Sequence, residues 1–373
     1  MRLILEGEAD DVQSAIILIA LRMKRETDLE NTGVLQALME GIEPVALATE
    51  RLCVLADPFN GFTRSLPAGP FVPAVLAACG TAALTHGALA VGPKFGLTHR
   101  HVLEAAGVPC LLSVGQAQAR LNSSNIGWAY LDQSVGVPEL AALTTLRRRI
   151  VKRPCLTTLE SGVTPMRAAR YTHLVTGFVH KAYPPVYRLM AKVAGFDGTS
   201  VVKGVEGGIV PTLTHESRLF QWSAVQGDSE AIVNPGAMGV ETQERCVPLP
   251  PDIADTTGRH CESQLVSLAA HTATLGLDAL NGQRGTMYDS IRLSSALALA
   301  GVNAGDSGNA ADTASGPAFG NASGSVSGPA FGDNGKPPAL TLDRIFLDQA
   351  LELVDEALAS GKAASFFQAG IGQ

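Results

Sequence analysis

Hydrophobic residues recur at intervals of three and four positions in the first forty residues of the chain. This spacing places Val12, Ile16 and Ile19 on one side of a first helix. Val34 and Leu38 share one side of a second helix in the same way. The pattern therefore predicts a helical hairpin at the N-terminus.

Short apolar runs then alternate with amphipathic segments. The apolar run 52–55 is followed by a loop that begins at Asp57, which is typical of the end of a buried strand. Further strands are predicted at 82–85, 126–129 and 200–203, and helices at 71–79, 99–106, 138–150, 183–194, 287–300 and 342–359. Because strands that alternate with helices form parallel sheets covered on both faces, we predict an α/β fold with a mostly parallel central sheet.

The 373 residues allow a small domain beside a large one. We expect a helical N-terminal domain over 1–45, joined by helices near 135–165, and an α/β domain over 46–302 and 339–373. The segment 303–338 is rich in Gly, Ala and Ser and contains Ser-Gly-Pro-Ala-Phe-Gly twice. Such a segment buries too little apolar surface to offset its chain entropy, so we predict a disordered insertion.

Charge is unevenly distributed along the chain. The net charge of -7 argues against a surface that is basic throughout, as a nucleic-acid clamp would require. Ten basic residues nevertheless lie between 145 and 192, against one acid, Glu160. This stretch indicates a local anion site, for a phosphorylated small molecule or for nucleic acid, and a solvated basic face is the alternative. The nucleic-acid candidates are Arg148, Arg149, Lys152, Arg153, Arg167, Arg170 and Lys181.

The six cysteines are scattered without a Cys-x-x-Cys pair, which favours buried thiols over disulfides or a zinc site. No apolar run reaches the roughly 18 to 20 residues that a membrane span needs. The N-terminus resembles neither a signal peptide nor a transit peptide. We expect a soluble intracellular protein, located in the cytoplasm or in a plastid, with no membrane partner.

Several motifs occur together along the chain. They include Ala-Leu-Arg-Met-Lys and Glu-Thr within 11–27, Thr-His-Gly at 85–87, Gly-Pro-Lys-Phe-Gly at 92–96 and a basic run at 146–153. In this order they resemble the anthranilate phosphoribosyltransferase family. The resemblance implies a helical domain hinged to an α/β domain, with phosphoribosyl pyrophosphate and magnesium between them, and a homodimer formed through the helical domain. It also implies that the chain starts partway into the helical domain.

Some positions keep the family's polar residues. His86 and Gly87 match the family's Lys-His-Gly-Asn-Arg loop, and Lys94 matches the lysine of its serine-rich phosphate loop. Arg147 matches the arginine that contacts the anthranilate carboxylate. The resemblance implies that these residues bind substrate, although a lone histidine at a strand end is more often structural.

The loop 56–64 departs from the family, which has Gly-Thr-Gly-Gly-Asp to enclose pyrophosphate with backbone N–H groups. Here Pro58 removes a donor and Phe59 adds bulk, so we expect this loop not to bind in the family's manner. Its remaining polar candidates for substrate binding are Asp57, Asn60 and Arg64.

The positions of the magnesium ligands also differ from those of the family. The family's Asp-Glu pair falls on Ile209 and Val210, and apolar side chains cannot ligate a hard cation. Glu206 is the candidate to replace these magnesium ligands. We leave open whether the chain binds magnesium, because the family's ligand pair is absent.

Two functional hypotheses follow, beside a third possibility that the chain is a structural dimer whose fold serves a protein partner. The first is a diverged glycosyl or phosphoribosyl transferase that binds or acts on a phosphorylated ribose ligand, with no catalytic residue assigned. The second is an inactive relative that binds nucleic acid non-specifically through 147–192. It resembles the family's diverged branch, whose members lack the glycine loop and the Asp-Glu pair and share motifs at 115–121, 180–183 and 204–207. The direction in which the basic side chains point should separate the two.

Overall fold

The computed structural model describes residues 1–254, 260–307 and 344–372. The chain begins with the helices α1 (Arg2–Leu5), α2 (Asp11–Lys24) and α3 (Asp28–Glu40). Asp10 caps α2 together with Gln13, and Thr27 caps α3 together with Glu30. These capping boxes satisfy backbone N–H groups that would otherwise lack partners, and they fix where the helices start. The predicted helical hairpin is confirmed.

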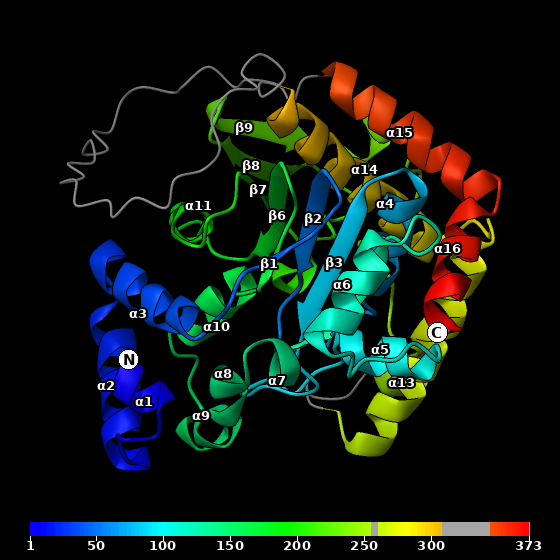
Figure 1. The fold of residues 1–373 in the computed structure, drawn as a ribbon. Helices are drawn as coiled ribbons and strands as arrows, with labels where there is room; N and C mark the ends of the chain where they lie inside the picture. Colours follow the sequence, from blue (N-terminus) through cyan, green and yellow to red (C-terminus); the bar gives the residue numbers. More distant parts are fainter. Residues whose placement is uncertain (255–259, 308–343, 373) are drawn as a thin grey trace.

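A central sheet occupies the middle of the molecule (Figure 1). Its first five strands are parallel and the last two are antiparallel. In order across the sheet they are β4 (Trp128–Asp132), β3 (Ala82–Gly87), β2 (Arg51–Ala56), β6 (Tyr171–Phe178), β7 (Gly198–Lys203), β8 (Ser217–Ser223) and β9 (Gly227–Val233). A separate parallel pair joins β1 (Val45–Ala46) to β5 (Met166–Arg167). The predicted α/β class with a mostly parallel sheet is confirmed.

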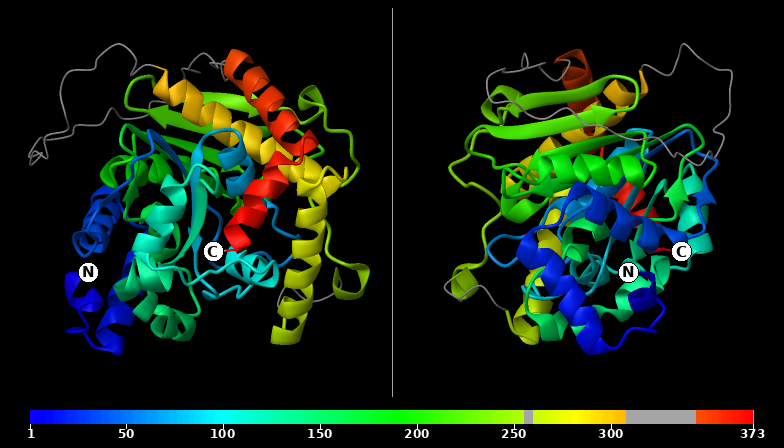
Figure 2. Two further views of the ribbon diagram at one scale, coloured as in Figure 1. Left: turned by 45° about the vertical axis from the view of Figure 1, so that its right-hand side comes forward. Right: turned by 90° about the vertical axis from the view of Figure 1, so that its left-hand side faces the viewer.

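Apolar side chains project from both faces of the sheet, as is expected for strands that are buried on both sides. On β2, Cys53 and Leu55 enter one core cluster and Leu52 and Val54 enter the other. The first cluster is covered by α4 (Val72–Ala78), α5 (His99–Ala105), α13 (Glu262–Leu280), α14 (Thr286–Asp306), α15 (Arg344–Ala359) and α16 (Lys362–Ile371). The layering is visible in two further views (Figure 2).

The second cluster lies under shorter helices and under the N-terminal hairpin. They are α6 (Val114–Asn122), α7 (Gln133–Gly136), α8 (Pro138–Ala142), α9 (Thr144–Ile150), α10 (Leu156–Leu159) and α11 (Pro184–Val193). The remaining short elements are α12 (Pro251–Ala254), η1 (Gly69–Phe71), η2 (Glu160–Gly162), η3 (Val205–Gly207) and η4 (Gly236–Met238). In Figure 1 the helices α1 to α3 lie beside α8, α9 and α10, and Arg149 of α9 forms an ion pair with Asp11 of α2.

The structure adds elements that the sequence pattern did not indicate, among them α6, β6, β8, β9, α13 and α16. The predicted helix at 138–150 is divided into α8 and α9 around Leu143. α14 continues to Asp306, and most of the predicted insertion at 303–338 lies outside the described residues. Among the helices that the structure describes, none is long and apolar enough to cross a membrane.

Candidate functional site

The candidate site lies at the carboxyl ends of the parallel strands. From β2 the chain proceeds to β3 and β4 on one side, whereas β6 and β7 lie on the other side of β2. Ligands of open α/β sheets bind outside the strand ends where the order reverses in this way. The loops 57–65, 87–98 and 204–210, which follow β2, β3 and β7, meet at this edge.

The loop after β2 and the loop after β3 are joined to each other. Phe62 and Leu97 exchange two backbone hydrogen bonds of 2.8 Å each. Lys94 Nζ donates to the carbonyl oxygen of Gly61 at 3.1 Å. The Lys94 side chain is therefore held against the loop that replaces the family's glycine loop.

The carboxylate of Glu206 is surrounded by hydrogen-bond donors from these loops. Arg64 N donates to Oε1 at 2.8 Å, and Thr63 N lies 3.2 Å from both oxygens. The hydroxyls of Ser65 and Thr63 donate at 3.1 and 3.3 Å. Lys94 Nζ completes the set at 2.7 Å from Oε2. We call Thr63, Arg64, Ser65 and Lys94 the anion cradle.

The cradle changes the expectation for the loop 56–64. Pro58 and Phe59 do remove the glycine-type geometry at the start of the loop, but the backbone N–H groups of Thr63 and Arg64 still enclose an anion. The anion is the chain's own carboxylate rather than a pyrophosphate.

The electrostatics of the cradle follow from burial and pairing. Burial acts to raise the pKa of Glu206, but the Lys94 ammonium and the donated hydrogen bonds hold it below its ordinary value. Burial lowers the pKa of Lys94 although Glu206 acts in the opposite direction. The side chain of Glu206 is 4% exposed, so the ion pair is largely removed from water.

Three buried side chains, those of Asp57, His99 and Thr85, form a hydrogen-bonded chain that links the same loops. Asp57 Oδ1 accepts from Ile209 N at 2.6 Å, and Asp57 Oδ2 lies 2.5 Å from His99 Nε2. His99 Nδ1 lies 2.8 Å from Thr85 Oγ1. Asp57 therefore ties the loop after β2 to the loop after β7, and it is a positioning residue.

Arg147 lies in the core and is paired internally. Its Nη1 and Nη2 donate to the two carboxylate oxygens of Glu160 at 2.6 and 2.8 Å, and Gln133 Nε2 donates to the same carboxylate at 3.1 Å. Both charged side chains are 1% exposed. Glu160, the one acid of the basic stretch, is thus bound to the guanidinium that the resemblance assigns to a substrate carboxylate.

His86 lies at the end of β3 beside a cavity of about 10 Å³, the space of about one water molecule. Phe59, Asp132 and Gln133 also line this cavity. Within the described part of the chain, neither His86 Nε2 nor Gln133 Oε1 has a hydrogen-bond partner. Burial lowers the pKa of His86 to about 4, so the ring is neutral at neutral pH.

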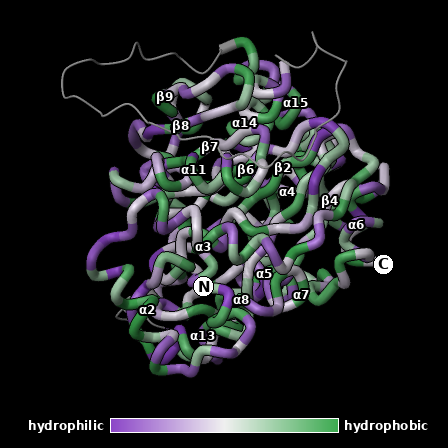
Figure 3. The backbone as a smooth tube through the Cα atoms, turned by 60° about the vertical axis from the view of Figure 1, so that its left-hand side comes forward, coloured by the Kyte–Doolittle hydropathy of each residue, from purple (hydrophilic) through white to green (hydrophobic). Residues whose placement is uncertain are grey.

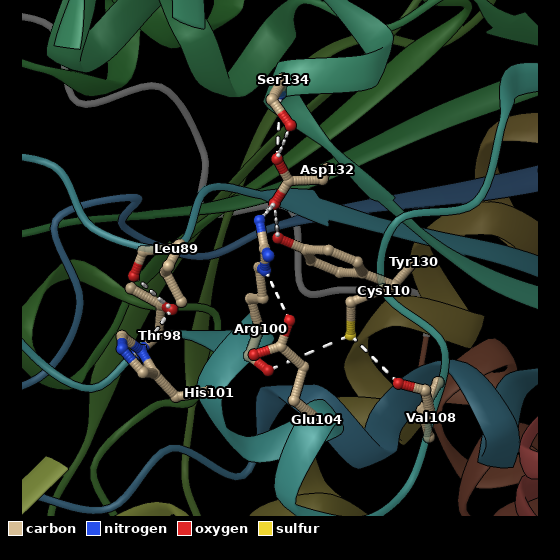
Figure 4. Close-up of polar contacts among 10 residues, drawn as sticks. All are labelled: Leu89, Thr98, Arg100, His101, Glu104, Val108, Cys110, Tyr130, Asp132 and Ser134. Atoms are coloured by element: carbon tan, nitrogen blue, oxygen red, sulfur yellow. Dashed lines mark hydrogen bonds and ion pairs between the residues drawn. The ribbon is translucent and has the colours of Figure 1, made fainter. Parts of the chain in front are cut away.

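Asp132 organises the neighbouring strand end (Figure 4). It accepts from Ser134 N at 2.9 Å, from Tyr130 Oη at 3.0 Å and from Arg100 Nη1 at 3.1 Å. Arg100 also donates to Glu104 at 2.8 Å. These bonds fix the turn between β4 and α7 that forms one wall of the His86 cavity.

The other sequence candidates take different positions. Asn60 is buried, and its carbonyl oxygen accepts from Gly96 N at 2.9 Å. Arg64 contributes its backbone to the cradle while its side chain is exposed. Gly87 ends β3 next to His86. The structure therefore gathers Asp57, Asn60, Arg64 and Lys94 in one place, and His86 and Arg147 adjoin a second network around Gln133 and Glu160.

The basic stretch does not form one outward stripe. Arg149 pairs with Asp11, and Arg170 pairs with Glu50 and Asp306. Arg167 is partly buried and donates to backbone carbonyls, including that of Thr164 at 3.0 Å. Arg148 lies over the ring of Phe95, 5.3 Å from its centroid. Among the described residues, no acid pairs with Lys152, Arg153 or Lys181, whose side chains are exposed.

Sequence reasoning missed an aromatic row near this stretch. The rings of His180, Tyr183 and Tyr187 follow one another at centroid distances of 6.3 Å each. They come from the loop after β6 and from α11, and Tyr187 is partly buried. The spacing of three and four residues was a usable signal, because it places Tyr183 and Tyr187 on one side of a helix.

Glu206 does not fit the role of a metal ligand. Its oxygens face an ammonium, two N–H groups and two hydroxyls, and a divalent cation would be repelled by Lys94 at 2.7 Å. Asp57 is occupied by His99 and Ile209, and Ile209 and Val210 are buried apolar residues. In the ranges that the structure describes, no group of three or more metal-binding side chains is present. We therefore derive no step through magnesium.

Known proteins resemble this chain in sequence and in fold. Residues 1–41 match the helical bundle domain of the glycosyl transferase family. The chain is 27% identical over 307 residues to the anthranilate phosphoribosyltransferase of Methanothermobacter thermautotrophicus, with 81% of each chain covered. The resemblance to the anthranilate phosphoribosyltransferase family is confirmed.

Other relatives match over a shorter part. An uncharacterized protein of Aquifex aeolicus is 28% identical over 56% of this chain and 62% of its own length. The anthranilate phosphoribosyltransferase of Sphingopyxis alaskensis is 27% identical over 64% of this chain and 66% of its own length. The matches to these two proteins therefore span less than two thirds of each relative.

Solved structures support the fold. Anthranilate phosphoribosyltransferase from Thermus thermophilus superimposes with a TM-score of 0.65 at 16% identity, covering 99% of this chain and 92% of its own. The enzyme from Saccharomyces cerevisiae in complex with PRPP and Mg gives 0.65 at 12% identity, covering 97% and 84%. At these identities the likeness establishes the fold alone.

Proposed function

We propose that this protein binds a phosphorylated ribose ligand at the anion cradle, as a diverged glycosyl or phosphoribosyl transferase. The observation that carries the proposal is the convergence of two backbone N–H groups, two hydroxyls and an ammonium on one carboxylate. Such a set of donors is complementary to a phosphate oxyanion as well as to a carboxylate. The Glu206 carboxylate marks where the ligand's oxyanion is held.

The charge of the cradle suits a leaving pyrophosphate. Phosphoribosyl transfer develops negative charge on the departing group, and fixed donors in a dry site stabilise such charge. Lys94 would supply the positive charge, and the side chains of Arg64 and Arg153 lie near enough to act on the pKa of Lys94. Asp57, His99 and Glu206 are all engaged with one another or with the backbone, so we assign binding and leave the acceptor unassigned.

Phosphoribosyl pyrophosphate should bind saturably to the wild-type protein in calorimetry, and Lys94→Ala should weaken it by at least about tenfold, because a charge-assisted bond to phosphate is lost. Lys152→Ala removes an exposed lysine and should change the affinity by less than about twofold. The affinity should also survive EDTA, because the described carboxylates do not fit a metal. Absence of saturable binding to the wild type would refute the proposal.

A second candidate function is binding of single-stranded nucleic acid. The observation that favours it is the His180–Tyr183–Tyr187 row, in which His180 is followed in the chain by the exposed Lys181, because stacking platforms next to cations are the usual means of holding single strands. The internal pairing of Arg149, Arg167 and Arg170 reduces the charge that is free for phosphates. Affinity for a short oligonucleotide that falls steeply with salt, with no sugar phosphate binding, would favour this candidate.

We also propose that a second copy of the chain covers the N-terminal helices. Five apolar side chains of α2 and α3 are largely exposed, namely Val12, Ile16, Ile17, Met23 and Leu29. The middle of α2, residues 15–21, is apolar throughout, as its colouring in Figure 3 shows. Leu18 packs in the core while Ile16 and Ile17 stay exposed, so α2 has a second apolar face that a partner would bury.

Light scattering should therefore give the mass of a dimer for the wild type and of a monomer for Ile16→Glu, because a buried unpaired carboxylate opposes association. Leu353→Glu changes an exposed apolar residue on α15 and should leave the dimer intact. A monomeric wild type would contradict the proposal.

A further inference from the structure

Glu206 occupies the cradle with the geometry of a bound ligand. Its two oxygens accept from four residues of two other loops, and three of the donors are backbone N–H groups or an ammonium at 3.2 Å or less. Yet Glu206 lies on a different loop from all of its donors and is separated from Thr63 by 143 residues. We propose that Glu206 is an internal occupant of the cradle that leaves when the phosphate of a ligand enters.

The backbone at Glu206 has an unusual conformation. Glu206 has φ 52° and ψ 14°, a left-handed conformation that costs energy for a residue with a side chain. Gly204, Gly207 and Gly208 surround it, and glycine permits conformations that other residues resist. This conformation directs the Glu206 side chain to the cradle, where it is held by its hydrogen bonds and by Lys94.

The backbone of this turn is fixed, which limits the displacement to the Glu206 side chain. Val205 N donates to Val210 O at 2.8 Å, Gly208 N donates to Val205 O at 2.9 Å, and Gly204 forms a bridge with Pro211. Ile209 N is held by Asp57. Displacement of Glu206 therefore moves its carboxylate out of the cradle and leaves β7 and the Asp57 contact in place.

The charges of the cradle favour exchange for a ligand with more negative charge. Burial lowers the pKa of Lys94, Glu206 acts to raise it, and the charges of Arg153 and Arg64 act to lower it further. Without Glu206 the cradle would hold the Lys94 ammonium and two unpaired N–H groups. A pyrophosphate carries more charge than one carboxylate and gains more from this field.

The inference rests on the proposed function only in the identity of the ligand, so inorganic pyrophosphate is the probe. Glu206→Ala should bind pyrophosphate at least about tenfold more tightly than the wild type, because the competing occupant is gone. Lys94→Ala in the Glu206→Ala background should abolish the gain. Glu241→Ala removes an exposed carboxylate elsewhere and should leave the affinity at the wild-type value.

Thermal unfolding gives an independent readout. Glu206→Ala leaves the Thr63 and Arg64 N–H groups and Lys94 without their acceptor, so it should melt below the wild type and recover with millimolar pyrophosphate. The wild type and Glu241→Ala should show little change under the same conditions. If Glu206→Ala does not fold, Glu206→Gln removes the charge with the same shape and serves in both measurements.

The outcomes separate the two proposals. Tighter binding of pyrophosphate by Glu206→Ala, with no variant binding phosphoribosyl pyrophosphate, would uphold the internal occupant and refute the ribose ligand. Equal affinity of the wild type and Glu206→Ala for both anions would refute the internal occupant and uphold an anion site that is already open.

Discussion

Replacing Arg147 by methionine should destabilise the fold by about 3–5 kcal/mol, because the substitution leaves Glu160 charged, buried and without its partner. The pair is 1% exposed on both sides, so water cannot take the place of the guanidinium. Gln133 would remain as a donor to Glu160, but one neutral donor does not balance a buried charge. Urea unfolding at neutral pH measures this loss directly.

The double variant Arg147→Met with Glu160→Gln separates charge from packing. A neutral amide at 160 can still accept from Gln133 and carries no charge that needs a partner. We therefore expect the double variant to recover at least half of the lost stability. If the single variant is as stable as the wild type, the buried pair is not formed as described.

The pairing of Arg147 also bears on function. A substrate carboxylate could reach this guanidinium only by displacing Glu160, which is bound through two hydrogen bonds of 2.6 and 2.8 Å. Lys94 is engaged in the same way by Glu206. Both cations that the family resemblance assigns to substrate are thus neutralised by carboxylates of the chain itself.

Replacing Gly177 by alanine should destabilise the protein by about 3 kcal/mol, because the added Cβ meets backbone atoms rather than a flexible side chain. It would lie 1.9 Å from the carbonyl oxygen of Gly208 and 2.5 Å from that of Gly207. The turn that carries Glu206 packs directly on β6 at this point. Relief of the clash must move that turn, so Glu206 should also lose its contacts in the cradle.

Gly115→Ala provides the control for this variant. Gly115 lies in α6 with no neighbouring atom within 4 Å of an added Cβ, and alanine favours the helix by up to about 1 kcal/mol. We expect this control to be as stable as the wild type or slightly more stable. Urea unfolding and pyrophosphate titration of both variants test the two consequences together. A Gly177→Ala protein of unchanged stability would show that the turn does not lie against β6.

The central strand β6 shows why the sequence pattern missed part of the sheet. Its residues include Thr172, His173 and Thr176, which are more typical of a surface than of a strand buried on both faces. Two of them find distant partners through the fold: Thr176 donates to Ala56 O at 3.0 Å, and His173 Nε2 lies 2.9 Å from Ser200 Oγ. These partners are 120 and 27 residues away, beyond what a local pattern can indicate.

The candidate site was predicted only in pieces. The sequence pointed to Lys94 and Arg147 as cations for an anion and to Glu206 as a metal ligand. The structure instead pairs Glu206 with Lys94, and it pairs Arg147 with Glu160. The difference arises because a charged residue has the same letter in the sequence whether it is free for a ligand or already neutralised.

By itself the sequence determined the helical hairpin, the α/β class and the family resemblance, because helix and strand periodicity and local motifs depend on neighbours a few residues apart. Only the tertiary structure decided that the loop at 63–65 closes around Glu206 and that the basic stretch turns partly inward. Such ion pairs join residues that are distant in the chain, and their energy depends on burial and on the distance between charges. Both quantities exist only after the chain has folded.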